Sequence, residues 1–141
     1  MIFPPVAEID FFGVYNPGLP NRECLVLQTK VAVNLAQLGI LNGWRMPNGQ
    51  AMPLWDNFFW FGDLQVSAQT WLVVMTCGGK LEATTHPNTG QPLFRFFWGR
   101  KATIYENSNV LPVLIQLGAV KIGERHIPQT LPRPSAQGLL Q

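Results

Sequence analysis

The sequence has few charged side chains. It contains ten Lys and Arg and eight Asp and Glu among 141 residues, or 13%. A soluble domain usually devotes about a quarter of its residues to these four types, chiefly to keep its surface hydrated. Apolar residues make up 47% of the chain. Much of the surface must therefore be neutral or apolar, and such surfaces are normally covered, most often by other protein chains.

The charges that are present show no clustering. The formal net charge is only +2, and no block of like charge occurs, so no direct binding to nucleic acid is expected. Segment 1–10 lacks a basic region and contains Pro4 and Pro5, which argues against a secretory signal. The apolar runs 71–75 and 110–115 are far shorter than the roughly 20 residues that cross a bilayer. We expect a protein made in the cytoplasm, with no membrane partner.

Recognisable catalytic and metal-binding motifs are absent as well. The two histidines, His86 and His126, have no second ligand at a metal-binding spacing, and both are expected to be exposed. Cys77 precedes two glycines that could direct N–H groups at an oxyanion, but a Gly-Gly pair is also an ordinary hairpin turn. We predict a protein that is not an enzyme, without metal or cofactor. Cys24 and Cys77 are predicted to be buried free thiols.

Apolar alternation and turn residues predict a mainly β fold. Along segment 22–33, Leu25, Leu27 and Thr29 fall on one side of a strand. Segment 70–76 is apolar on both alternations, which favours a central strand covered on both faces. The fold class is an antiparallel β-sandwich or barrel, jelly-roll-like, with at most one or two short helices. Further strands are predicted at 54–61, 80–85, 91–98, 101–105 and 119–123.

Two short helices are predicted. Segment 34–38 could form one helical turn with Asn34 as its N-cap and Gly39 as its stop. Segment 110–117 has apolar residues at helical spacing, although three of its residues are β-branched and Pro112 lies near its start. Tight turns are predicted at the Asn-Gly pairs 42–43 and 48–49, with a loop over 46–53, and at 86–90.

Both ends of the chain are predicted to be arms around one β-domain. Segment 1–20 is rich in Pro and Gly and also strongly apolar, so it should be extended and irregular and should dock on its own domain or on a neighbour. Segment 126–141 contains three prolines within seven residues and should be an extended arm of polyproline character. The β-domain would occupy 21–125.

These features favour a structural subunit of a larger assembly, without enzymatic activity. Decoration, cementing and connector proteins of virus or phage particles have this general character, and the partners would be copies of this chain and a larger shell or scaffold protein. Such a protein would be made in the cytoplasm and incorporated into a virion. The predicted interaction residues are Phe3, Phe11, Phe12, Tyr15, Arg100, Lys101, Pro128, Leu131, Pro132 and Pro134.

Other functions are open at this point. Asp56 and Asp63 flank the aromatic run 58–61, as acids flank stacking rings in sugar sites, so a carbohydrate- or ligand-binding module is the alternative. A cysteine enzyme would use Cys77, His86 and an aspartate. Segment 94–101 interleaves basic and aromatic residues, a pattern of single-strand binding platforms. The tryptophans and phenylalanine considered for a ligand site are Trp55, Trp60, Phe61, Trp71 and Trp98.

Overall fold

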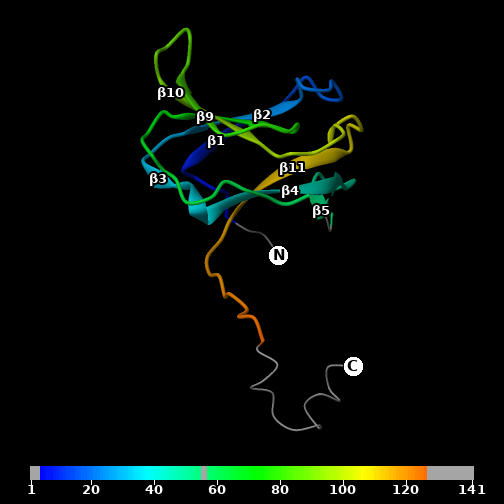
Figure 1. The fold of residues 1–141 in the computed structure, drawn as a ribbon. Coiled ribbons are helices and arrows are strands. Elements are labelled where there is room, and N and C mark those ends of the chain that lie inside the picture. Colours follow the sequence, from blue (N-terminus) through cyan, green and yellow to red (C-terminus); the bar gives the residue numbers. More distant parts are fainter. Residues whose placement is uncertain (1–3, 55–56, 127–141) are drawn as a thin grey trace.

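The structure, a computed structural model, describes residues 4–54 and 57–126. Its largest sheet has five strands in the order β1-β2-β8-β10-β9, and it forms the upper layer in Figure 1. β2 and β8 are antiparallel neighbours. Both alternate strictly between fully and partly buried residues, which shows that one face of each strand packs in the core. The strands of this sheet are β1 (Ile9–Tyr15), β2 (Cys24–Thr29), β8 (Trp71–Met75), β9 (Glu82–Thr85) and β10 (Pro92–Phe97).

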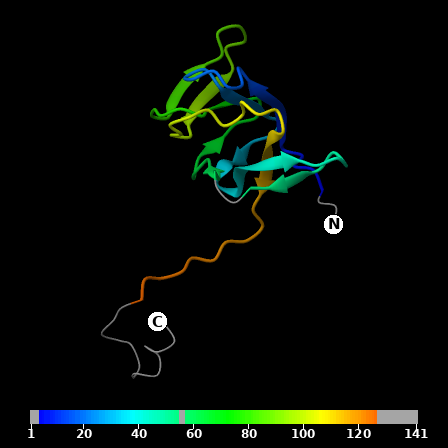
Figure 2. The same cartoon turned by 90° about the vertical axis from the view of Figure 1, so that its right-hand side faces the viewer.

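A second sheet forms the lower layer of the sandwich, and Figure 2 shows the same two layers from the side. Its strand order is β11-β4-β5, and β6 also pairs with β4. A small third sheet joins β3 to β7. These strands are β3 (Val33–Asn34), β4 (Leu38–Arg45), β5 (Ala51–Pro53), β6 (Phe59–Trp60), β7 (Gln65–Val66) and β11 (Val110–Gln116). The mainly β, sandwich-like fold class is therefore confirmed.

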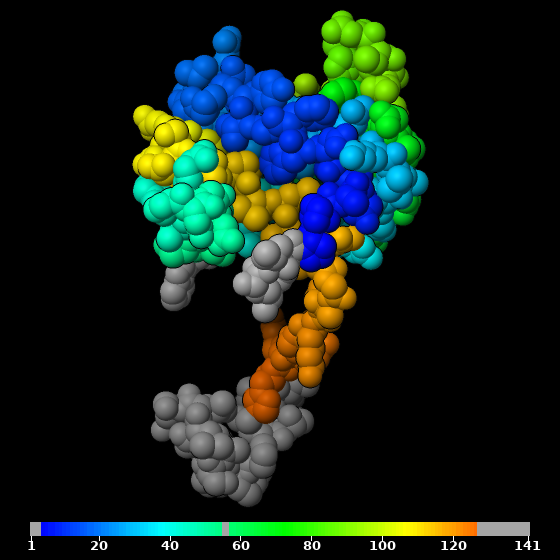
Figure 3. Space-filling model, turned by 180° about the vertical axis from the view of Figure 1, so that it is seen from behind, coloured from blue at the N-terminus to red at the C-terminus, as the bar shows by residue number. Residues whose placement is uncertain are grey.

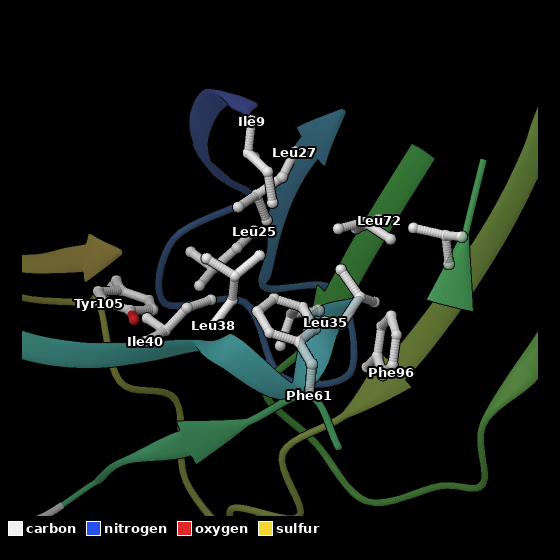
Figure 4. Close-up of a cluster of buried hydrophobic side chains, with 12 residues drawn as sticks. Ile9, Leu25, Leu27, Leu35, Leu38, Ile40, Phe61, Leu72, Phe96 and Tyr105 are labelled. Atoms are coloured by element: carbon white, nitrogen blue, oxygen red, sulfur yellow. The ribbon is translucent and has the colours of Figure 1, made fainter. Parts of the chain in front are cut away.

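The hydrophobic core fills the space between the two layers (Figure 4). Leu25 and Leu27 from β2 and Leu72 from β8 are fully buried on one side of it. Leu38 and Ile40 from β4 close the other side. Burial of such side chains contributes about 1.5–3 kcal/mol each to the unfolding free energy. The remaining buried members of the core are Ile9, Leu35, Phe61, Val66, Val74, Phe96 and Tyr105.

Several local predictions are confirmed. Asn34 caps a single 3-10 turn, η1 (Leu35–Gln37), and its side-chain oxygen accepts a hydrogen bond from the Ala36 N–H at 2.8 Å. Gly49 adopts a φ of +82°, which only glycine reaches easily, in the turn between β4 and β5. The 86–90 turn joins β9 to β10, closed by the Gly90 N–H on the His86 carbonyl at 2.9 Å.

The predicted helix at 110–117 is wrong, since these residues form β11. They pair with β4 over seven residues, and a continuous ladder together with β-branched side chains outweighs the helical spacing. The predicted turn at 42–43 is also wrong, because Gly43 lies inside β4, where a Cβ would come within 2.8 Å of the Ala51 Cβ. Nor does Gly39 stop a helix, because it too lies within β4.

The expected hairpin at 78–79 is wrong for a topological reason. β8 and β10 are parallel neighbours, and β9 pairs with the far side of β10. Segment 76–81 therefore crosses the end of β10 instead of turning back beside β8. Gly79 is required here because a Cβ would collide with the ring of Phe97.

Two predicted strands do not form, and the strand predicted at 54–61 is much shorter than expected. Residues 101–105 make a loop, and 119–123 have no strand partner among the described residues. In segment 54–61 only β6 is a strand, and residues 55–56 lie outside the described residues. The predicted loop at 46–53 ends in β5.

The N-terminal segment is more ordered than predicted. Residues 9–15 are not irregular but form β1, an edge strand of the five-stranded sheet, with a bulge between Phe11 and Gly13. The apolar segment thus docks on its own domain. The predicted C-terminal arm lies outside the described residues except for His126, and so does Phe3. Among the residues that are described, no helix is long and apolar enough to cross a membrane.

Candidate interaction surfaces

The five-stranded sheet has one face that the rest of the described chain leaves uncovered. β2 and β8 bury every second residue in the core, and the residues between them are only partly buried. We call this set the outer face. The sequence predicted that strand 70–76 is covered on both sides, but only the inner side of β8 is covered by another sheet. The outer face consists of the partly buried residues Cys24, Val26, Gln28, Trp71, Val73, Met75, Arg95 and Phe97, together with Leu93, which is buried at 7% exposed.

The strand register arranges the outer face in rows that run across the sheet. Cys24 is paired with Met75, and Met75 with Phe97, so one row is apolar along its whole length. The middle row runs from Val26 through Val73 to Arg95. Because paired side chains on one face lie about 4.5–5.5 Å apart, each row is a continuous strip. The result is a largely apolar surface across β2, β8 and β10.

Arg95 is the one charged residue among the nine of the outer face. Arg95 forms an ion pair with Glu82 on β9, with 2.8 Å between the guanidinium and the carboxylate.

Partial burial raises the pKa of the Cys24 thiol, an effect that the Glu23 charge adds to and the Arg95 charge opposes. Cys24 and Cys77 are free thiols and only partly buried, so the prediction of free thiols is confirmed and that of full burial is not.

Aromatic rings occupy one end of the outer face. The rings of Phe12 and Trp71 lie 5.5 Å apart, and those of Trp71 and His86 lie 5.2 Å apart. The Trp71 indole N–H donates to the Gln91 side-chain oxygen at 2.8 Å, and Gln28 donates to the same oxygen at 3.2 Å. The prediction that His86 is exposed is therefore wrong, because the ring of Trp71 partly covers it.

The predicted interaction residues fall in two places. Phe12 and Tyr15 on β1 are each 49% exposed, whereas Phe11 packs partly against the core. Arg100 and Lys101 line a hollow of about 70 Å³ together with Cys77. The exposed aromatic residues therefore lie on β1, and the basic pair lies in the loop after β10. Phe3, Pro128, Leu131, Pro132 and Pro134 lie outside the described residues.

The structure does not bring Cys77 and His86 together. The His86 ring packs against Trp71 at the first residue of β8, and Cys77 follows the last residue of that strand. Six residues of extended chain span about 20 Å. A thiol and an imidazole must lie within hydrogen-bond reach to act as nucleophile and base, so these two residues cannot form a dyad.

A smaller polar and aromatic cluster surrounds η1. Trp60 is 55% exposed, and its indole N–H donates to the Ala36 carbonyl at 2.7 Å. The Asn34 amide, which caps the same turn, donates to the Asp63 carboxylate at 2.8 Å. Of the other residues considered for a ligand site, Phe61 is buried in the core, Trp71 and Trp98 are partly buried, and Trp55 and Asp56 lie outside the described residues.

Sequence reasoning did not single out Glu23, a buried carboxylate that accepts three backbone hydrogen bonds. It is 1% exposed, and its carboxylate accepts hydrogen bonds from the N–H groups of Ile104 at 2.6 Å, Tyr105 at 3.0 Å and Gly18 at 2.8 Å. It thereby ties the 99–109 loop to the β1–β2 connection. The only sequence signal was a lone acid at the head of a strongly apolar strand.

Within the described ranges, no group of three or more His, Cys, Asp or Glu is placed to hold a metal ion. Comparison of the chain with protein-family models, curated proteins and solved structures gave no match.

Proposed function

We propose that this protein is a structural subunit of a larger assembly, without enzymatic activity, and that it binds neighbouring subunits through the outer face. The observation that carries the proposal is that uncovered face, whose central rows hold Val26, Val73 and Met75. Large contiguous apolar patches on a folded protein usually mark an interface with another macromolecule. Virus and phage decoration, cementing and connector proteins are the class of subunit that we propose, with incorporation into the particle.

The composition of the outer face suits a protein partner. Charged groups are depleted at the core of protein interfaces, and polar groups form the rim. Here Arg95 and Glu82 lie toward the β9 margin and Asp10 and Lys30 form a second ion pair, at 3.1 Å, on the β1–β2 side. A flat sheet face is complementary to another flat sheet face or to a helix. The expected partners are other copies of this chain and a larger shell or scaffold protein.

Sedimentation velocity of the purified chain over a concentration series tests this proposal. We expect species larger than the monomer, and we expect Val73→Lys to shift them toward smaller species because a lysine at the centre of the face would have to be desolvated. Thr85→Lys on β9, an exposed position whose side chain lies on the opposite face of the same sheet, is the matched control and should leave assembly unchanged. A wild-type chain that is monomeric at every concentration, alone and with a candidate shell protein, contradicts the proposal.

A carbohydrate-binding module is the second candidate function. The supporting observation is the cluster at η1, where an exposed indole, Trp60, and the hydrogen-bonded pair Asn34 and Asp63 meet at Ala36. Sugar sites combine a stacking ring with amide and carboxylate groups in this way.

Tryptophan fluorescence titration against a panel of oligosaccharides separates the two functions. A binding module should show a saturable shift that Trp60→Ala abolishes, while Trp44→Ala, another exposed tryptophan, leaves the shift in place. No response to any sugar leaves the structural role as the only proposed function.

A further inference from the structure

The segment after β11 carries apolar side chains that nothing in the described chain covers. Val120 is 70% exposed and Ile122 is 79% exposed, more than any other large apolar residue among those described. Residues 118–126 are all exposed and run away from the sandwich (Figures 1 and 3). Val120, Lys121 and Ile122 alternate apolar and polar, which is the pattern of a half-buried strand. We call segment 119–123 the exchange segment.

One side of β11 is available to a further strand. The Leu117 N–H donates to the Gln37 carbonyl at 2.6 Å, and the Asn109 carbonyl accepts from Arg45 at 2.7 Å, so odd-numbered residues direct their backbone groups toward β4. By alternation the backbone groups of Leu114 and Gln116 point away from β4. Pro112 belongs to the same set, so its missing N–H costs no bond to β4. Among the described strands none pairs with this edge.

An apolar groove lies along that edge. It has a volume of about 370 Å³, and its walls are residues 113–116 of β11 and the N-terminal residues Pro4, Pro5 and Val6. Figure 3 shows this side of the molecule, with β11 in gold beside the dark-blue N-terminal segment. The groove thus combines a hydrogen-bonding strand edge with apolar walls, which is the arrangement that accepts an added strand.

From these features we propose that the groove of one copy binds the exchange segment of a second copy as an added β-strand. Val120 and Ile122 would enter the groove, and Lys121 would remain in water. The occupant is a second copy because the chain continues past Gln116 in the direction of β11, held by the Leu117 bond to Gln37, so that the described part of the exchange segment does not enter its own groove. Reciprocal exchange gives a closed dimer. This inference rests on the proposed structural function and names one of its partners.

Cross-linking between two distinguishable chains tests the exchange. In a Cys24→Ser/Cys77→Ser background, a tagged full-length chain with Ile122→Cys is mixed with an untagged one with Gln116→Cys, and a short bismaleimide is added. We expect a tagged–untagged product. Replacing Gln116→Cys by Thr84→Cys, on the edge strand β9 of the other sheet, should give none. A product formed only within a single chain carrying Ile122→Cys and Gln116→Cys would place the segment on its own sheet and overturn the proposal.

Sedimentation of the full chain separates failure of this inference from failure of the proposed function. In a Val73→Lys background, which removes association through the outer face, Val120→Lys/Ile122→Lys should weaken the remaining self-association at least tenfold, whereas Lys121→Ser, between the two positions, should leave it unchanged. If self-association survives the double substitution, exchange is wrong and the structural role stands. If the wild-type chain never associates with itself or with a shell protein, both are wrong.

Discussion

The two faces of the five-stranded sheet are built from similar residues but lie in different environments. On the inner face Leu25, Leu72 and Val74 are fully buried against the second sheet. On the outer face Val26 and Val73 have the same apolar character, and no described element covers them. The inner face therefore supplies stability, and the outer face holds apolar area that only a neighbour can bury. The apolar area of the outer face adds little to the stability of the isolated domain, so we infer that a neighbouring molecule buries it.

The largest effect is expected from truncating the inner face. Leu72→Ala removes a fully buried side chain from the centre of the core and should lower the unfolding free energy by about 4 kcal/mol. Urea denaturation followed by tryptophan fluorescence measures it. A loss below about 1 kcal/mol would mean that this face is not tightly packed.

The next comparison is between the contributions of a buried carboxylate, Glu23, and an exposed one, Glu82, to the unfolding free energy. Glu23→Ala leaves the N–H groups of Gly18, Ile104 and Tyr105 without their acceptor and should cost about 3 kcal/mol of unfolding free energy. Glu82→Ala, which breaks the exposed ion pair with Arg95, should cost less than about 1 kcal/mol. Equal losses in the two variants, measured by urea denaturation, would contradict the role assigned to Glu23.

Two adjacent valines give the sharpest comparison of the faces. Val74→Thr puts a hydroxyl into the core and should cost about 2 kcal/mol. Val73→Thr makes the same chemical change on the outer face and should stay within about 0.5 kcal/mol in the monomer. Thermal unfolding of both variants at low concentration measures the difference. If the two losses are equal, the outer face is covered in the isolated chain.

A smaller effect is expected at alkaline pH. Burial, reinforced by the Glu23 charge, raises the pKa of Tyr105 far above its ordinary value. Above about pH 10 the unfolded chain loses this phenolic proton and the folded chain keeps it, so the unfolding free energy should fall by about 1.4 kcal/mol per pH unit. Urea denaturation between about pH 9 and pH 11 measures the slope in a Cys24→Ser background, since the pKa of that thiol is raised too. Tyr105→Phe should remove this contribution. A slope that persists in Tyr105→Phe would assign it to another group.

Local signals in the sequence located several elements correctly. The alternation around Leu25 and Leu27 identified β2 and its buried side, and the apolar run at 71–75 identified β8 as a central strand. Asn34 was identified as a helix cap and the Asn-Gly pair at 48–49 as a turn. These succeed because side-chain periodicity and capping depend on a few neighbouring residues.

The predictions that failed depended on distant residues. The strand β11 resembled a helix until β4 supplied a ladder for it. Gly43 and Gly79 resembled turn glycines, but both admit the close approach of another segment. The candidate site was predicted only in part. Phe12 and Tyr15 were predicted as interaction residues and lie exposed on β1, beside the outer face. The outer face itself was not predicted, because the apolar residues of 70–76 indicated a strand covered on both sides. In these cases, contacts with residues distant in the sequence decide which element a residue belongs to and whether it is covered.

By itself the sequence determined a mainly β protein with too few charges for its size and with apolar residues on both sides of its central strands. Periodicity reports which residues share a face, because it is a property of one strand. The tertiary structure alone decided which of those faces is covered, where β11 leaves an open edge and which side chains Glu23 connects. Coverage depends on where the chain places its second layer, and the strands that the structure describes cover only one side of the largest sheet.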